Sequence, residues 1–117
     1  MYEIKKTLEI SAAHFLELDY ESKCKTLHGH NWIVTVYLRA KELNKNGMIM
    51  DFTEIKQKVT SQLDHKVLND VVPFNPTAEN LAKYICDQLA PFCYRVDVTE
   101  SENNTASYYN PDQPFWA

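Results

Sequence analysis

Three of the four histidines have the type and spacing of a metal site. His28 and His30 form a His-x-His pattern at the start of an apolar run, 32–38, that is typical of a β-strand. Residues two apart on a strand point to the same face, so both imidazoles can be aimed at one point. His14 ends the preceding strand-like run and would supply a third imidazole. Because catalytic zinc commonly has three protein ligands and one open position, we predict an open zinc site here, against the alternative of unrelated surface or core histidines.

Cys24 lies close to this pattern, with three residues between it and His28. A free thiol has a pKa of about 8.5, and a neighbouring cation or metal lowers it. Cys24 could be a fourth zinc ligand, which would close the site and make it structural. It could instead be a thiolate base or nucleophile beside the metal, or it could be inert. The residues alone leave these alternatives open.

Two further acidic positions could take part in chemistry. Asp64 precedes His65, and a carboxylate can fix the tautomer of an imidazole and raise its basicity, as in acid–base relays. Adjacent side chains diverge on a regular strand or helix, so this pairing needs loop geometry; a helix-terminal charge pair is the alternative. Glu100 ends a predicted strand before a turn, where an acid is usually solvated but could bind a ring that carries adjacent N–H donors.

Composition narrows the class of protein. With 117 residues, of which 44% are hydrophobic and 12% aromatic, the chain is expected to form one domain, 1–117. No apolar run approaches a membrane span and the start lacks the pattern of a signal peptide, so we expect a cytoplasmic protein without membrane contact. The formal net charge of −4 disfavours a nucleic-acid partner. Cys86 and Cys93 fit no Cys-x-x-Cys motif and are expected to be core residues.

The hydrophobic periodicity predicts four strands and two helices. The strands are expected over 2–13, 28–40, 94–100 and 105–109, and the helices over 53–63 and 77–89, with a structured loop over 63–70 and a tail, 110–117, that caps an edge. The order ββααββ indicates an α+β domain with an antiparallel four-stranded sheet. Such a sheet has two open edges, and edges with alternating apolar residues tend to be paired or covered, so we expect subunits to join through their sheets.

Taken together, these motifs resemble the family of 6-pyruvoyl-tetrahydropterin synthase and 6-carboxy-tetrahydropterin synthase over nearly the whole chain. The shared segments are Ala12–His14, Cys24–Asn31, Gly47–Phe52, Leu63–Asn69, Asn75–Asn80 and Thr99–Ser101. The resemblance implies the T-fold, an antiparallel sheet with two helices on one face. It also implies that sheets of trimers close into a barrel and that two trimers stack into a homohexamer with active sites at subunit interfaces.

The resemblance also implies a role for each site residue. His14, His28 and His30 would be the zinc ligands, and Cys24 the general base. Its thiolate would be supported by Asp64 and His65 from across an interface, and Glu100 would bind the amino and ring N–H groups of the pterin. The implied substrate is 7,8-dihydroneopterin triphosphate. Cys24 and His65 would move protons on its side chain while triphosphate leaves.

Two branches of the family share this chemistry. The carboxy branch releases acetaldehyde and triphosphate and forms 6-carboxytetrahydropterin on the route to queuosine and other 7-deazapurines, whereas the pyruvoyl branch forms 6-pyruvoyl-tetrahydropterin. The short spacing between Cys24 and His28 resembles the carboxy branch, although the segment Glu100–Asn104 resembles the pyruvoyl branch. We predict a zinc-dependent lyase of the carboxy branch. The alternatives are the pyruvoyl enzyme, a non-catalytic zinc module closed by Cys24, and a simple zinc hydrolase.

Overall fold

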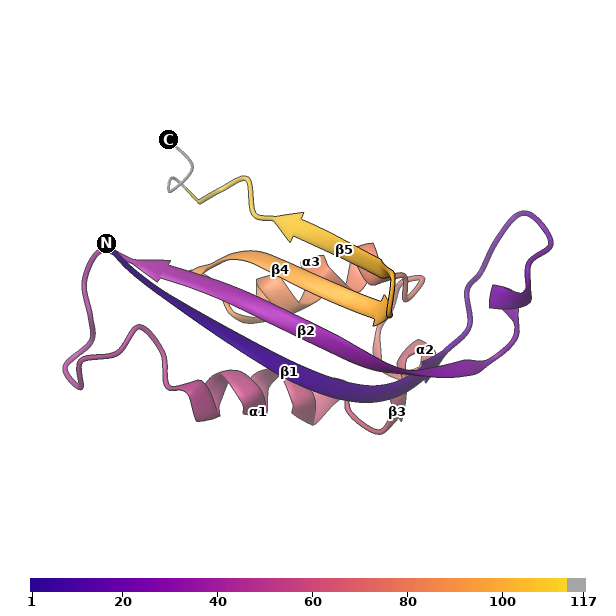
Figure 1. Ribbon diagram of the computed structural model, residues 1–117, viewed down its shortest axis with the longest axis horizontal. Coiled ribbons are helices and arrows are strands. Elements are labelled where there is room, and N and C mark those ends of the chain that lie inside the picture. Colours follow the sequence, from indigo (N-terminus) through magenta and orange to yellow (C-terminus); the bar gives the residue numbers. More distant parts are fainter. Residues whose placement is uncertain (114–117) are drawn as a thin grey trace.

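The computed structural model describes residues 1–113 and shows one sheet with helices on one side (Figure 1). The predicted α+β architecture and element order are present, with additional short elements. In chain order the elements are β1 (Tyr2–His14), the 3₁₀ turn η1 (Lys23–Lys25), β2 (His28–Ala40), α1 (Phe52–Leu63), β3 (Lys66–Val67), α2 (Leu68–Val71), α3 (Ala78–Gln88), β4 (Cys93–Ser101) and β5 (Asn104–Tyr109).

The two long strands β1 and β2 form the spine of the sheet. They pair antiparallel along their whole length, from Tyr2 opposite Ala40 to His14 opposite His28. In both strands buried and exposed residues alternate, because successive side chains on a strand point to opposite faces. The predicted strands 2–13 and 28–40 are therefore confirmed, and their pairing places the two histidine-bearing strand ends side by side.

Helices α1 and α3 cover the same face of the sheet. Asp51 caps α1 by accepting a hydrogen bond from the Thr53 amide at 2.8 Å, and Thr77 caps α3 through the Asn80 amide at 3.1 Å. The buried side chains Ile55 and Val59 of α1 belong to the same hydrophobic core as the inward residues of the strands. Figure 1 shows α1 alongside β1 and α3 behind β4 and β5. The prediction of two main helices on one face is confirmed.

The sheet has five strands in the described part of the chain, so the prediction of four is wrong. The extra strand β3 pairs parallel with β1, with Ala12 opposite Lys66, at the outer edge of the order β3-β1-β2-β4-β5. It forms because Asp64 ends α1 and the His65 amide donates to the Ser11 carbonyl at 2.7 Å, which brings the chain alongside β1. Two residues are too few to show an alternating pattern, which is why periodicity predicted only a loop there.

The remaining predictions about packing have mixed outcomes. Cys86 and Cys93 are buried free thiols in the core, as predicted. The expectation that subunits join through the outer strands β3 and β5 stays a prediction. The expected edge-capping tail lies partly outside the described residues, because 114–117 are not described. Among residues 1–113, the helices are all too short or too polar to cross a bilayer.

Candidate functional site

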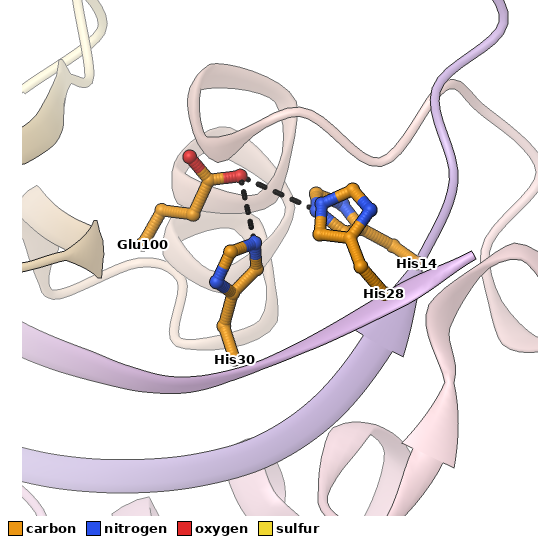
Figure 2. A group of neighbouring side chains, drawn as sticks. All are labelled: His14, His28, His30 and Glu100. Atoms are coloured by element: carbon orange, nitrogen blue, oxygen red, sulfur yellow. Dashed lines mark ion pairs between the residues drawn. The ribbon is translucent and has the colours of Figure 1, made fainter. Parts of the chain in front are cut away.

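The strand register brings the three predicted histidines together at one end of the sheet. His14 is directly opposite His28, and His30 lies two residues further along β2 on the same face. The ring centroid of His14 is 4.6 Å from that of His28 and 5.3 Å from that of His30, and the last two are 4.8 Å apart. Figure 2 shows the three rings grouped around one point, with Glu100 of β4 closing the group. The predicted convergence of three imidazoles is therefore present in the folded chain.

Main-chain carbonyls hold two of these rings by their Nδ1 atoms. The Nδ1 atom of His14 lies 2.8 Å from the Pro76 oxygen, and that of His28 lies 2.7 Å from the Thr26 oxygen. A carbonyl can only accept a hydrogen bond, so Nδ1 must carry the proton in both rings. In a neutral ring this leaves the lone pair on Nε2, which is the tautomer that binds a metal ion when a carbonyl orients the ring.

The Nε2 atoms of His14 and His30 have no hydrogen-bond partner, although they are buried. Their nearest charged atom is Oε1 of Glu100, at 3.3 Å from His14 and 3.4 Å from His30. For His14 this places a nitrogen lone pair against a carboxylate oxygen, and two acceptors this close repel unless a cation lies between them. One ligand atom from each of His14, His28, His30 and Glu100 lies within 4.8 Å of the others. The cluster therefore fits a metal ion.

Burial favours the neutral form of the His14 and His30 imidazoles, which is the form that binds a metal ion. Removal from water lowers the pKa of His14, against smaller opposing effects from the Pro76 carbonyl and Glu100. It also lowers the pKa of His30, against a smaller opposing effect from Glu100. Trp32 packs edge-to-face against both rings: its ring centroid is 4.8 Å from that of His14 and 5.2 Å from that of His30. The Trp32 indole is fixed in turn by donating to the Ala12 carbonyl at 3.1 Å. Neutral imidazoles at His14 and His30 offer lone pairs, so they suit the binding of a divalent cation better than the binding of an anion.

A cavity of about 670 Å³ opens beside the cluster and contains the predicted cysteine. Its lining includes Cys24, His28, His30 and Glu100, so the thiol, two imidazoles and the carboxylate share one space. Cys24 lies in the 3₁₀ turn η1, where the Ser22 hydroxyl accepts a hydrogen bond from its amide at 3.2 Å. The volume is in the range of small-molecule sites, and the mixture of polar and apolar lining is typical of them.

Asp64 and His65 do not join Cys24 in this cavity. His65 lines a separate cavity of about 500 Å³, which shares only Gly29 and His30 with the first. The His65 ring is 81% exposed and its Nε2 atom lies 3.6 Å from Asp64 Oδ2, while Asp64 Oδ1 accepts a hydrogen bond from the Ser11 amide at 2.9 Å. His65 has a φ of 59°, which is uncommon for a residue other than glycine and turns its side chain outward from the end of α1. Within one chain Asp64 and His65 contact each other, but they do not line the cavity that contains the Cys24 thiol.

Two groups of the site, the Pro76 carbonyl and the Trp32 ring, were not singled out from the sequence. The Pro76 carbonyl orients His14. Glu100 was predicted to bind substrate, but its position against the imidazoles was not predicted. Trp32 shares the strand parity of His28 and His30, and this periodicity could have placed it beside the His30 ring on the same face. A carbonyl that acts from the loop before α3 leaves no local pattern in the sequence.

Comparison with known proteins agrees with this geometry. Residues 3–111 match the family model described as 6-pyruvoyl tetrahydropterin synthase. A 6-carboxy-5,6,7,8-tetrahydropterin synthase of Bacillus subtilis (strain 168) is 31% identical over 92% of this chain and 84% of the relative. A 6-pyruvoyl tetrahydrobiopterin synthase of Dictyostelium discoideum is 40% identical over 74% of this chain and 73% of the relative.

A solved structure extends the comparison to three dimensions. The 6-pyruvoyl tetrahydropterin synthase of Caenorhabditis elegans superposes with a TM-score of 0.75 at 27% identity, over 93% of this chain and 95% of that chain. The family model and the structural comparison each cover more than nine-tenths of the chain, and the residues matched by the family model include the three histidines. The chain belongs to the 6-pyruvoyl tetrahydropterin synthase family.

Proposed function

We propose that this protein is a zinc-dependent lyase that acts on 7,8-dihydroneopterin triphosphate. The observation that carries the proposal is the pair of buried, unpartnered Nε2 atoms that face a carboxylate beside a cavity large enough for a pterin. His14, His28 and His30 would hold the zinc, because their donor set is the all-imidazole one that catalytic zinc accepts. Zinc held there would polarise oxygens of the substrate side chain and so make the attached C–H bonds more acidic.

The protein groups of the cavity have separate tasks in this proposal. Glu100 binds the amino and ring N–H groups of the pterin, because a carboxylate can accept two parallel hydrogen bonds. Cys24 acts as the base that takes a proton from the substrate side chain. Support for this assignment comes from its place in the lining of the same cavity as Glu100 and two of the imidazoles.

Asp64 and His65 complete the proton relay in an assembled protein. The His65 ring is too far exposed, and lines the wrong cavity, to serve the thiol of its own chain. We therefore assign the pair to the active site of a second copy, in a homohexamer built as a dimer of trimers. Support comes from the pre-formed Asp64–His65 contact, the exposure of His65, and the position of β3 and β5 as the outer strands of the sheet in residues 1–113.

Within the family we assign the chain to the carboxy branch, which forms 6-carboxytetrahydropterin, acetaldehyde and triphosphate on the route to queuosine and other 7-deazapurines. The argument is the short Cys24–His28 spacing, in which the turn η1 ends at Lys25 and β2 begins at His28. Relatives of both branches match the chain, so similarity alone favours neither product. The 6-pyruvoyl product is the second candidate, favoured by the segment 100–104.

One experiment tests these assignments together. The purified protein is incubated with 7,8-dihydroneopterin triphosphate, and the products are identified by mass spectrometry with a separate assay for acetaldehyde. Acetaldehyde together with 6-carboxytetrahydropterin supports the carboxy branch; the 6-pyruvoyl product without acetaldehyde overturns that branch and keeps the enzyme class. No turnover by zinc-loaded protein would refute the proposal. The Cys24→Ala variant separates the remaining classes, because a closed zinc module would lose its metal and a simple zinc hydrolase would keep its activity.

A further inference from the structure

We propose that Asn69 and Asn75 are positioning residues that set the place of Cys24 in the cavity. The inference rests on the proposed role of Cys24 and adds to it the residues that hold its loop. The segment 15–27 connects β1 to β2 and has no strand partner of its own in the described structure. Its shape therefore depends on contacts to other parts of the chain, among them paired hydrogen bonds from two asparagine side chains.

The side chain of Asn69 forms hydrogen bonds with both the amide and the carbonyl group of Phe15. Its Oδ1 accepts a hydrogen bond from the Phe15 amide at 2.9 Å, and its Nδ2 donates to the Phe15 carbonyl at 2.9 Å. The side-chain amide therefore replaces a neighbouring strand at this residue, with one acceptor and one donor used. Asn69 belongs to α2, which packs against β1, so its position is fixed by the core.

Asn75 repeats the arrangement two residues further along the loop. Its Oδ1 accepts from the Glu17 amide at 2.9 Å and its Nδ2 donates to the Glu17 carbonyl at 3.1 Å. Asn75 is itself held, because its carbonyl accepts from the Thr77 amide at 2.8 Å and from Asn80 Nδ2 at 3.0 Å. The start of α3 therefore fixes the position of Asn75. We call the paired hydrogen bonds of Asn69 to Phe15 and of Asn75 to Glu17 the two clamps.

Leu16 lies between the two clamped residues and makes the link to the thiol. Its amide donates a hydrogen bond to the Cys24 carbonyl at 2.8 Å. The same segment, 69–76, also orients His14 through the Pro76 carbonyl. One segment thus contacts both a metal-site imidazole and, through the residues on either side of Leu16, the part of the loop that bonds to Cys24. The distance between the thiol and the metal site depends on these contacts.

The clamps should affect chemistry more than affinity. A base must lie within hydrogen-bond reach of the proton that it abstracts, and an error of about 1 Å can lower the rate by about 10²-fold. Neither asparagine lines the cavity of about 670 Å³, so neither is placed to contact a substrate there. Their loss should therefore lower kcat and change KM little.

The test compares Asn69→Ala and Asn75→Ala with the control Asn44→Ala. Asn44 caps main-chain amides in a similar way, accepting from Asn46 at 2.9 Å and from Met48 at 3.1 Å, but in the turn before α1. The readouts are kcat, KM, bound zinc per chain, and the rate at which iodoacetamide alkylates Cys24 in the folded protein. The other two cysteines are only 1% and 0% exposed, so alkylation reports on Cys24.

We expect both clamp variants to keep their zinc, to lose about 10- to 100-fold in kcat with KM nearly unchanged, and to alkylate faster than the parent. The control should match the parent in all these readouts. If the clamp variants instead keep the parent's alkylation rate and kcat and lose only thermal stability, the inference is wrong. Should Asn69→Ala fail to fold, the more peripheral Asn75→Ala decides the matter. Alkylation does not require turnover, so the clamp can fail or hold independently of the proposed reaction.

Discussion

Replacement of Glu100 by glutamine separates two roles that the structure allows for this side chain. The carboxylate faces both the imidazole cluster and the cavity, and 26% of the side chain is exposed. Its Oε1 atom lies 3.3 Å and 3.4 Å from the Nε2 atoms of His14 and His30. Ligands of a tetrahedral zinc, with bonds of about 2.0–2.2 Å, are about 3.4 Å apart, so these distances also suit a fourth metal ligand.

The proposed role of Glu100 as the pterin anchor predicts a definite loss. Glutamine keeps the shape of the side chain but has one acceptor oxygen, and its NH₂ group would face an N–H donor of the pterin. A hydrogen bond to a charged partner is worth about 1.5–3 kcal/mol, so pterin affinity should fall about 10- to 150-fold. Zinc content should stay near that of the parent, because three imidazoles remain.

Both quantities can be measured without turnover. Zinc per chain is determined by elemental analysis, and the affinity for neopterin, which carries no phosphate, by fluorescence titration. The matched control is Glu102→Gln, which removes a carboxylate from the exposed turn next to the site. Unchanged neopterin affinity in Glu100→Gln would refute the anchor role, and loss of zinc in parallel with pterin would identify Glu100 as a metal ligand instead.

Four further predictions follow from the same geometry. His28→Ala should weaken zinc binding by at least about 100-fold, measured by competition with a chromogenic chelator, because two imidazoles and a carboxylate remain. Cys24→Ala should keep stoichiometric zinc and lose roughly 10²- to 10⁴-fold in kcat; intact activity would exclude the thiol as base. Asp64→Asn should keep zinc and lower kcat by about 10²-fold. Equal kcat in parent and variant would contradict the relay role of Asp64. Burial lowers the pKa of His14 and His30 below the ordinary 6.5, so as the pH falls below that value the unfolded chain binds protons that the folded chain does not. The melting temperature of zinc-free protein should therefore drop between about pH 7 and about pH 5.5, and His14→Gln should flatten this dependence.

The long elements and the metal ligands could be predicted from the sequence because their signals are local. Alternating burial along β1 and β2 and the four-residue spacing in α1 and α3 repeat often enough to identify strand and helix. His28 and His30 lie on one face by strand parity alone, and His14 needed only the antiparallel pairing of the two strands to meet them. Side-chain period and chain direction determine these positions whatever surrounds them.

Other features were decided only when distant segments packed together. Glu100 reaches the imidazoles because β4 pairs with β2. Asn69 and Asn75 clamp a loop more than fifty residues earlier in the chain. The strand β3 forms where the end of α1 lies beside β1. The Asp64–His65 pair forms, but His65 lines a different cavity from Cys24, a separation that no spacing indicated. Hydrogen bonds from side-chain amides to main chain carry no periodic signal, since one residue in one orientation suffices. Only the folded chain determines which backbone each of them meets.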